Sequence, residues 1–292
     1  MDQLAYVIKK MNLHVLAVEG VPESFSSAVY RLKLSSQETV FLKIPYTTEK
    51  LVREAEALEV LRETIRVPDV LDYWEGDEEI TGALLLSCIQ GQPVPKKVDN
   101  KLAYDIGVNH ATLHTVTPDV TKEYRGLSNV YEEWGTFLNK QFYNFAKDVE
   151  GAIPADLYDQ TLELYEAWRK LLPPPDGPCF IHRDFRSANI LTSNNQVSGI
   201  IDFETARFGS TEIDFTKINR DIFLHNPGTR EAYQEGYRSV RPLIDLDMIL
   251  PFYRFTDAFT SLGWCRQRGL EKHQAFFDEN LAILKGLLLA FR

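Results

Sequence analysis

The stretch from Cys179 to Ala206 most constrains what this chain can fold into. A triplet of His, Arg and Asp ends at Asp184, and Asn189 follows five positions later. Two short apolar runs come next, separated by a polar turn, and the second run ends at Asp202. This pattern predicts a loop, a strand, a tight turn and a second strand with an acid at its end.

These residue types together fit the chemistry of phosphoryl transfer. A carboxylate such as Asp184 can orient an acceptor hydroxyl towards a terminal phosphate and take its proton. The phosphates of a nucleotide require Mg²⁺, which prefers oxygen ligands from few protein groups. The amide oxygen of Asn189 and the carboxylate of Asp202 are the candidate ligands, and a hairpin between them would bring both to one edge of a site.

The triplet His182-Arg183-Asp184, with Asn189 and the later Ile201-Asp202-Phe203, resembles the catalytic and metal-binding loops of the protein-kinase-like superfamily. The pattern is most similar to the aminoglycoside phosphotransferase and choline kinase group of small-molecule kinases. That group usually has Gly where this chain has Arg183, and it lacks the last Gly of the protein-kinase DFG triplet, as does this chain with Glu204. Arg186 stands where serine/threonine protein kinases carry a lysine near the transferred phosphate, and the resemblance implies a similar place for it.

The resemblance implies an α+β, bilobal protein-kinase-like fold. We expect an antiparallel β-sheet in a small nucleotide-binding lobe, residues 1–88, and a mainly helical large lobe, residues 93–292, with the catalytic loop and the acceptor pocket. The hinge between them is expected at about residues 87–92, where an apolar strand ends in a Gly/Pro-rich segment.

Lys43 interrupts the apolar run V-F-L-K-I. A lysine in a buried strand is costly unless it meets an anion, whereas on an edge strand it can point to solvent. The resemblance favours a phosphate-binding lysine with an acidic partner on the next helix. Glu54, Glu56 and Glu59 compete for that role, and Glu54 is preferred because its spacing from Leu51 and Leu58 places it on the packed face.

Further nucleotide contacts follow from the resemblance alone. Ser26 and Ser27 would lie over the phosphates in a Ser-rich turn, although an ordinary hairpin turn explains them equally well. In the hinge, the backbone groups of Ser87, Cys88 and Ile89 are candidates for the adenine edge.

The large lobe contains several helical patterns. Leu102, Ile106, His110 and Leu113 recur at helical spacing and predict a core helix. We assign no catalytic role to His110 or His114, because a histidine on such a face is usually structural. Helices are expected over 129–150 and 154–172 and would help build the acceptor pocket. Their aromatic side chains are interpreted as core residues, and the alternative is a pocket wall that binds a cation. Asp214 and His182 are read as supports of the loop that carries Asp184.

Composition excludes some function classes. The net charge of −10 argues against a nucleic-acid partner, and an acidic surplus in residues 118–178 is either a solvated surface or an attraction for a cationic substrate. Three scattered cysteines, no signal-peptide pattern and no long apolar run predict a cytoplasmic protein without a membrane partner. We expect a monomer or a homodimer.

The sequence therefore predicts an ATP-dependent, Mg²⁺-dependent kinase that phosphorylates a hydroxyl of a small, possibly cationic acceptor. GTP in place of ATP is not excluded. One alternative is a housekeeping kinase for an amino alcohol, a sugar or a homoserine-like acceptor. Another is a nucleotide-binding pseudokinase with a regulatory role, which the presence of Lys43, Asp184 and Asp202 disfavours.

Overall fold

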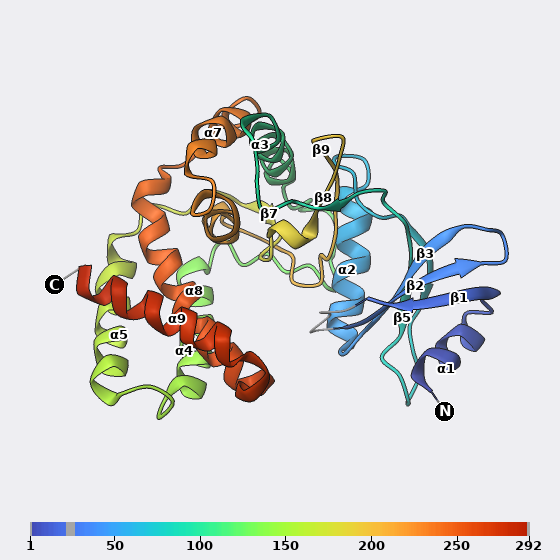
Figure 1. Ribbon diagram of the computed structural model, residues 1–292, viewed down its shortest axis with the longest axis horizontal. Coiled ribbons are helices and arrows are strands. Elements are labelled where there is room, and N and C mark those ends of the chain that lie inside the picture. The colour runs from blue at the N-terminus through green and yellow to red at the C-terminus, as the bar shows by residue number, and fades with distance from the viewer. Residues whose placement is uncertain (1, 22–26, 291–292) are drawn as a thin grey trace.

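The computed structural model describes residues 2–21 and 27–290. An N-terminal part built on a β-sheet stands beside a larger, mainly helical part (Figure 1). We call residues 2–87 of the described chain the small lobe and residues 92–290 the large lobe. This mixed, kinase-like architecture confirms the predicted fold class.

Five antiparallel strands form the sheet of the small lobe, in the spatial order β1-β2-β3-β5-β4. They are β1 (Val15–Gly20), β2 (Ser27–Leu34), β3 (Thr39–Pro45), β4 (Val70–Trp74) and β5 (Ala83–Ser87). β3 is the central strand, and its Lys43 lies opposite Val29 of β2 and Leu84 of β5. Because Lys43 is on a central strand and only 5% exposed, the edge-strand interpretation of this lysine is wrong.

The two faces of this sheet are covered by different helices. On one face α1 (Gln3–Lys10) packs its Val7 with alternate strand residues such as Leu42 and Leu85. The opposite face, including Leu84, packs with α2 (Thr48–Leu61). This two-faced burial explains why β5 reads as a continuous apolar run rather than an alternating one.

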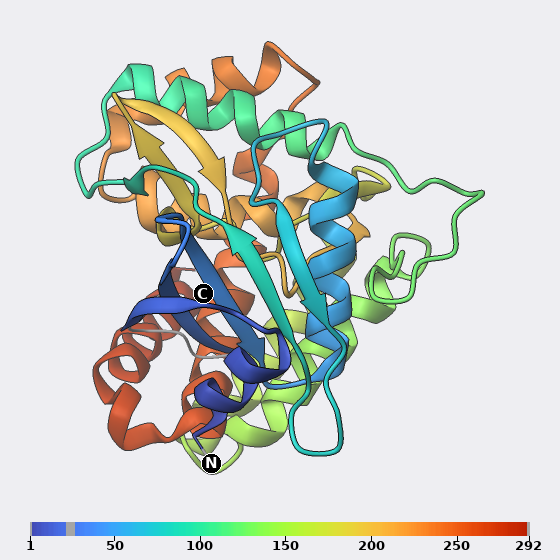
Figure 2. The same cartoon turned by 90° about the vertical axis from the view of Figure 1, so that its right-hand side faces the viewer.

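α2 buries residues at helical spacing. Leu51, Leu58 and Leu61 are on its packed face, and Glu54 lies between them with 1% exposure. Figure 2, which looks onto the small lobe, shows α2 running alongside the strands. The helix therefore carries the Glu54 carboxylate into the contact between the lobes.

The chain passes from β5 to a short strand, β6 (Gln92–Pro93), which pairs with β8 (Ile190–Ser193). β8 and β9 (Gln196–Ile200) form the hairpin expected between Asn189 and Asp202. Asn194 and Asn195 make its turn with positive φ angles, which asparagine tolerates better than most residues. The domain boundary proposed at residues 87–92 stays a prediction and falls in the connection between β5 and β6.

The large lobe is built mainly from helices. The principal ones are α3 (Asn100–His114), α4 (Trp134–Val149), α5 (Ala155–Trp168), α6 (Phe215–Ile218), α7 (Arg230–Arg238), α8 (Leu246–Arg268) and α9 (Leu270–Ala290). A two-stranded ladder of β7 (Cys179–Ile181) and β10 (Arg207–Gly209) leads into and out of the loops that carry the polar motif.

α3 and α7 cross at very close range. A Cβ added to Gly107 of α3 would collide with the backbone of Tyr233, and one added to Gly236 of α7 would collide with the backbone of Tyr104. This close approach brings Tyr233 and Tyr237 of α7 against His110 and His114 of α3. The helix pair is therefore closely packed and joined by hydrogen bonds next to the polar loop.

Candidate active site

Lys43 is the centre of an ionic cluster between the lobes. Its Nζ lies 2.6 Å from Glu54 Oε2, 2.6 Å from Asp202 Oδ1 and 3.4 Å from Glu204 Oε2. Burial by itself would lower the pKa of Lys43, but the three carboxylates, Asp202 foremost, raise it above its usual value. Lys43 is therefore a permanent cation held by an acid from α2 and two acids from the segment after β9.

The three acids of this cluster differ in exposure. Glu54 is buried, and burial raises its pKa to about 7 against the opposing effect of Lys43. The side chain of Asp202 is 33% exposed; burial would raise its pKa, but the nearby cations, Lys43 foremost, lower it below its usual value. Asp202 also has a φ of 71°, an uncommon conformation for a residue with a side chain, which turns its carboxylate back towards the small lobe.

Asp184 lies in a second polar cluster with Asn189 and Arg186. Its Oδ2 accepts hydrogen bonds from Arg186 Nε at 3.0 Å and from Asn189 Nδ2 at 3.0 Å. Asn189 Nδ2 also donates to the Asp184 carbonyl oxygen. The backbone carbonyl oxygen of Asn189 accepts the N–H of Ile201, the residue before Asp202. These bonds join the loop before β8 to the end of β9.

Asp214 holds the loop from below. Its two carboxylate oxygens accept the backbone N–H groups of His182 and Arg183, each at 2.6 Å. His182 adds a hydrogen bond from its ring to the Ile201 carbonyl oxygen at 3.0 Å. Arg183 has a φ of 67°, so this position suits the Gly of the related group, and an arginine here costs about 1 kcal/mol in backbone strain. The conformation of the loop that carries Asp184 is thus held by Asp214, a residue that lies outside the loop.

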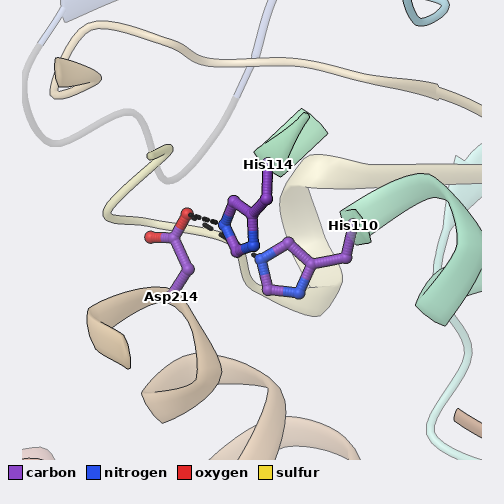
Figure 3. A group of neighbouring side chains, drawn as sticks. All are labelled: His110, His114 and Asp214. Atoms are coloured by element: carbon purple, nitrogen blue, oxygen red, sulfur yellow. Dashed lines mark hydrogen bonds and ion pairs between the residues drawn. The ribbon is translucent and has the colours of Figure 1, made fainter. Parts of the chain in front are cut away.

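Asp214 is itself surrounded by two buried histidines (Figure 3). His114 Nε2 lies 3.3 Å from Asp214 Oδ2, and His110 Nε2 lies 3.8 Å from the same oxygen. Burial lowers the pKa of both rings, that of His110 to about 3, so both are neutral. A neutral His114 that donates from Nε2 must accept at Nδ1, which lies 2.8 Å from the Tyr237 hydroxyl.

Two groups in the described part of the chain bring potential metal ligands together. One is His110, His114 and Asp214, and the other is Glu54, Asp202 and Glu204. The first is closed to solvent and already supports the loop. In the second, the Lys43 ammonium stands among the carboxylates and supplies the positive charge.

The residues predicted to contact the nucleotide differ in burial and in hydrogen bonding. Ser26 lies outside the described residues, whereas Ser27 is buried at the start of β2. Ser87 forms two hydrogen bonds with Asp69. The N–H of Asp69 donates to the Ser87 hydroxyl at 2.8 Å, and the N–H of Ser87 donates to the Asp69 carbonyl oxygen at 2.9 Å. Ile89 is buried, and its side chain packs closely against Gly199 of β9. Their proposed contacts with a nucleotide stay predictions.

Sequence reasoning missed several residues of the contact between the lobes. Glu204 pairs with Lys50 at 2.9 Å as well as with Lys43, and Arg53 donates to the Glu204 carbonyl oxygen at 2.9 Å. Glu56 accepts three backbone N–H groups, from residues 125, 126 and 127, at 2.7 to 2.9 Å. A signal was available, because Lys50, Arg53 and Glu54 recur at helical spacing and so share one face of α2.

A buried ion pair joins the lysine of the central strand to the glutamate of α2 and faces a loop with Asp184, Asn189 and Asp202. This is the arrangement of a kinase-like phosphotransferase. Residues 17–268 match the model of the phosphotransferase enzyme family. The match spans most of the chain, so the protein belongs to this family. The resemblance inferred from the motifs is confirmed.

Solved structures share the fold over nearly their full length. The GDP and kanamycin complex of APH(2″)-IIIa has a TM-score of 0.75 and 17% identity, covering 97% of each chain. Macrolide 2′-phosphotransferase MphH from Brachybacterium faecium has a TM-score of 0.67 and 15% identity, covering 99% of this chain and 96% of its own. Amicoumacin kinase hAmiN, with a TM-score of 0.73 and 14% identity, covers 99% of this chain and 92% of its own.

At these identities the structural likeness concerns the fold. A comparison with curated protein sequences gave no significant match. Among the described residues, no helix combines the length and apolar character needed to span a membrane.

Proposed function

We propose that the protein transfers the γ-phosphate of ATP to a hydroxyl group of a small molecule. The observation that carries this proposal is the double engagement of Lys43, 2.6 Å from both Glu54 and Asp202. Such an arrangement holds a cation and a partly exposed carboxylate beside the loop of Asp184, where a nucleotide phosphate and an acceptor can meet. Family membership supports phosphotransfer independently.

Asp184 is the proposed catalytic residue. It would orient the acceptor hydroxyl and take its proton while the hydroxyl oxygen attacks the phosphorus. Arg186 Nε, 3.0 Å from Asp184 Oδ2, is placed to contact the phosphoryl group as it moves. Lys43, positioned by Glu54, would bind the phosphates that remain on the nucleotide.

Mg²⁺ fits the donor set of Asn189 and Asp202. The amide nitrogen of Asn189 is engaged by Asp184, which leaves the amide oxygen as the group able to bind a cation. Lys43 contacts only Oδ1 of the partly exposed Asp202 carboxylate. When bound, Mg²⁺ would neutralise charge on the β- and γ-phosphates.

The nucleotide base is proposed to lie against the connection at residues 87–92, with Ser87 and Ile89 as contacts and Ser27 nearer the phosphates. The similar structures include one named for GDP and one named for AMP-PNP, so both purines belong in the test. The cysteines Cys88, Cys179 and Cys265 are all free, which suits the reducing cytoplasm where we place the reaction.

Acceptor-dependent release of ADP tests this function. The purified protein is incubated with Mg²⁺, ATP or GTP, and a panel of aminoglycosides, macrolides, choline, homoserine and simple sugars. We expect release with one compound class, and none for Asp184→Asn, which should still bind the nucleotide. Equal turnover by Asp184→Asn would overturn the role of Asp184. Nucleotide binding without transfer to any acceptor would favour the pseudokinase alternative.

A further inference from the structure

Three arginines gather beside the catalytic loop without taking part in the contacts described for Asp184. Arg53 comes from α2, Arg183 from the loop itself and Arg207 from β10. Two of them lie near the ring of Phe137 on α4, with the guanidinium carbon of Arg183 5.0 Å and that of Arg207 5.8 Å from the ring centre. Cations at such distances face the electron-rich ring, which helps to hold them together.

In the described part of the chain, none of these arginines forms an ion pair with an acid. Arg183 donates to Gln141 Oε1 at 2.9 Å, and Arg207 donates to Ser128 Oγ at 2.5 Å. The bonds of Arg53 go to two backbone carbonyl oxygens. The Nε atoms of Arg183 and Arg207 are buried and have no hydrogen-bond partner among the described residues.

Two nearby carboxylates form hydrogen bonds or ion pairs with groups other than these arginines. Asp214 uses both oxygens for backbone N–H groups, and Glu204 uses its oxygens for Lys43 and Lys50. The arginines repel one another, while Asp214 and Asp184 attract Arg183, and Glu49 and Glu204 attract Arg53 without forming an ion pair with it. Burial first, and then the charge of Arg207, lowers the pKa of Arg183 to about 10, and burial followed by Arg53 lowers the pKa of Arg207.

We propose that Arg53, Arg183 and Arg207 form a binding site for an oxyanion, a phosphate or a carboxylate group. Guanidinium groups present several N–H donors in a plane and match the paired oxygens of such anions. All three residues are half-buried, so each keeps some exposure to solvent. The site collects one arginine from the small lobe and two from the large lobe, and an anion there would join the lobes.

The anion has two possible sources. Arg183 directly precedes Asp184, so the anion can be an acidic group carried by the acceptor, and this source rests on the proposed phosphotransfer. It can also be a separate small anion that binds independently of the reaction. In either case three clustered positive charges disfavour a polycationic acceptor at this position.

Inorganic sulfate is a direct probe of the site. The protein is saturated with MgADP so that the nucleotide site is filled, and sulfate is titrated against chloride at equal ionic strength while thermal unfolding is followed. We expect a sulfate-dependent rise in Tm for the native protein and for Arg31→Gln, which removes an exposed arginine of β2. Arg207→Gln should weaken the sulfate affinity by about tenfold or more, the loss expected for a charge-assisted hydrogen bond.

No sulfate response in the native protein, or an equal response in Arg207→Gln, would overturn the proposal. If Arg207→Gln does not fold, Arg53→Gln is the second variant and the same criteria hold. Binding is read without turnover, so failure of the proposed kinase reaction leaves this test intact. Once an acceptor is found, competition between sulfate and the acceptor assigns the anion to the acceptor, and sulfate binding without competition assigns it to a separate ligand.

Discussion

His114 and Asp214 form a fully buried pair, with Nε2 of the histidine 3.3 Å from Oδ2 of the aspartate. The same aspartate accepts the N–H groups of His182 and Arg183, so the pair connects helix α3 to the loop of Asp184 (Figure 3). Burial would raise the pKa of Asp214, but the two adjacent histidines lower it well below its usual range. The loop that carries the proposed base thus rests on a permanently ionised carboxylate.

Asp214→Asn should therefore impair catalysis more than nucleotide binding. An amide offers one acceptor oxygen and would turn its NH₂ group towards one of the two backbone N–H groups, leaving that donor unpaired at a cost of about 1–3 kcal/mol. The resulting shift of Asp184 should lower kcat by about 100-fold. Turnover kinetics and calorimetric titration of MgATP measure the two effects separately. An unchanged kcat in a folded variant would show that Asp214 serves stability alone.

Much of this site follows from local sequence patterns. The spacing of Asn189 and Asp202 around a polar turn predicts a hairpin, and β8 and β9 form one. The helical spacing of Leu51, Glu54 and Leu58 likewise singles out Glu54, which lies 2.6 Å from Lys43 Nζ. In both cases a regular element converts sequence separation into spatial proximity.

Other contacts depend on how distant segments meet. The cluster of Arg53, Arg183 and Arg207 draws on three segments, and nothing local to Arg207 shows that its side chain turns towards Phe137. The acceptor role of Glu56 depends on an irregular segment more than 60 residues away. Such contacts are set by the packing of the lobes, which periodicity in one helix does not encode.

Removal of the Lys43 charge should destabilise the fold and weaken nucleotide binding. In Lys43→Met, Glu54 would be buried without its cation and Glu204 would keep only Lys50, a loss of about 3–5 kcal/mol in the free energy of unfolding. Lys50→Met is the matched control, because among the described residues Lys50 forms an ion pair with Glu204 alone, and it is more exposed than Lys43. Urea unfolding and MgATP titration of both variants provide the measurements. Equal losses in the two variants would contradict a special role for Lys43.

Glu56 should control the opening of the contact between α2 and residues 125–127. Its carboxylate accepts three backbone N–H groups there, and Gln in its place would leave at least one of them poorly paired. We expect Glu56→Gln to lose about 1–3 kcal/mol of stability and to speed hydrogen exchange at those amides. Glu59→Gln is the control, since Glu59 forms an ion pair with Arg62 on the surface of the same helix. Unchanged exchange at residues 125–127 would exclude this anchoring role.

The pH dependence of stability should report on Glu212, a buried acid of the large lobe. Burial raises its pKa from 4.5 to about 8, and its carboxyl group contacts the Ser210 hydroxyl and the N–H of Asp176. The folded protein therefore holds a proton that the unfolded chain releases above about pH 4.5. This contribution is complete below that pH and disappears as the pH rises through about 8, at up to about 1.4 kcal/mol per pH unit.

Glu212→Gln should remove this slope, because glutamine resembles the protonated acid in shape and does not ionise. We expect the variant to match the native protein near pH 5 and to be the more stable of the two above about pH 8. Glu231→Gln, which removes an exposed acid of α7, should keep the native slope. Chemical unfolding at a series of pH values gives the three curves. Parallel curves for the native protein and Glu212→Gln would mean that Glu212 is ionised in the folded state throughout.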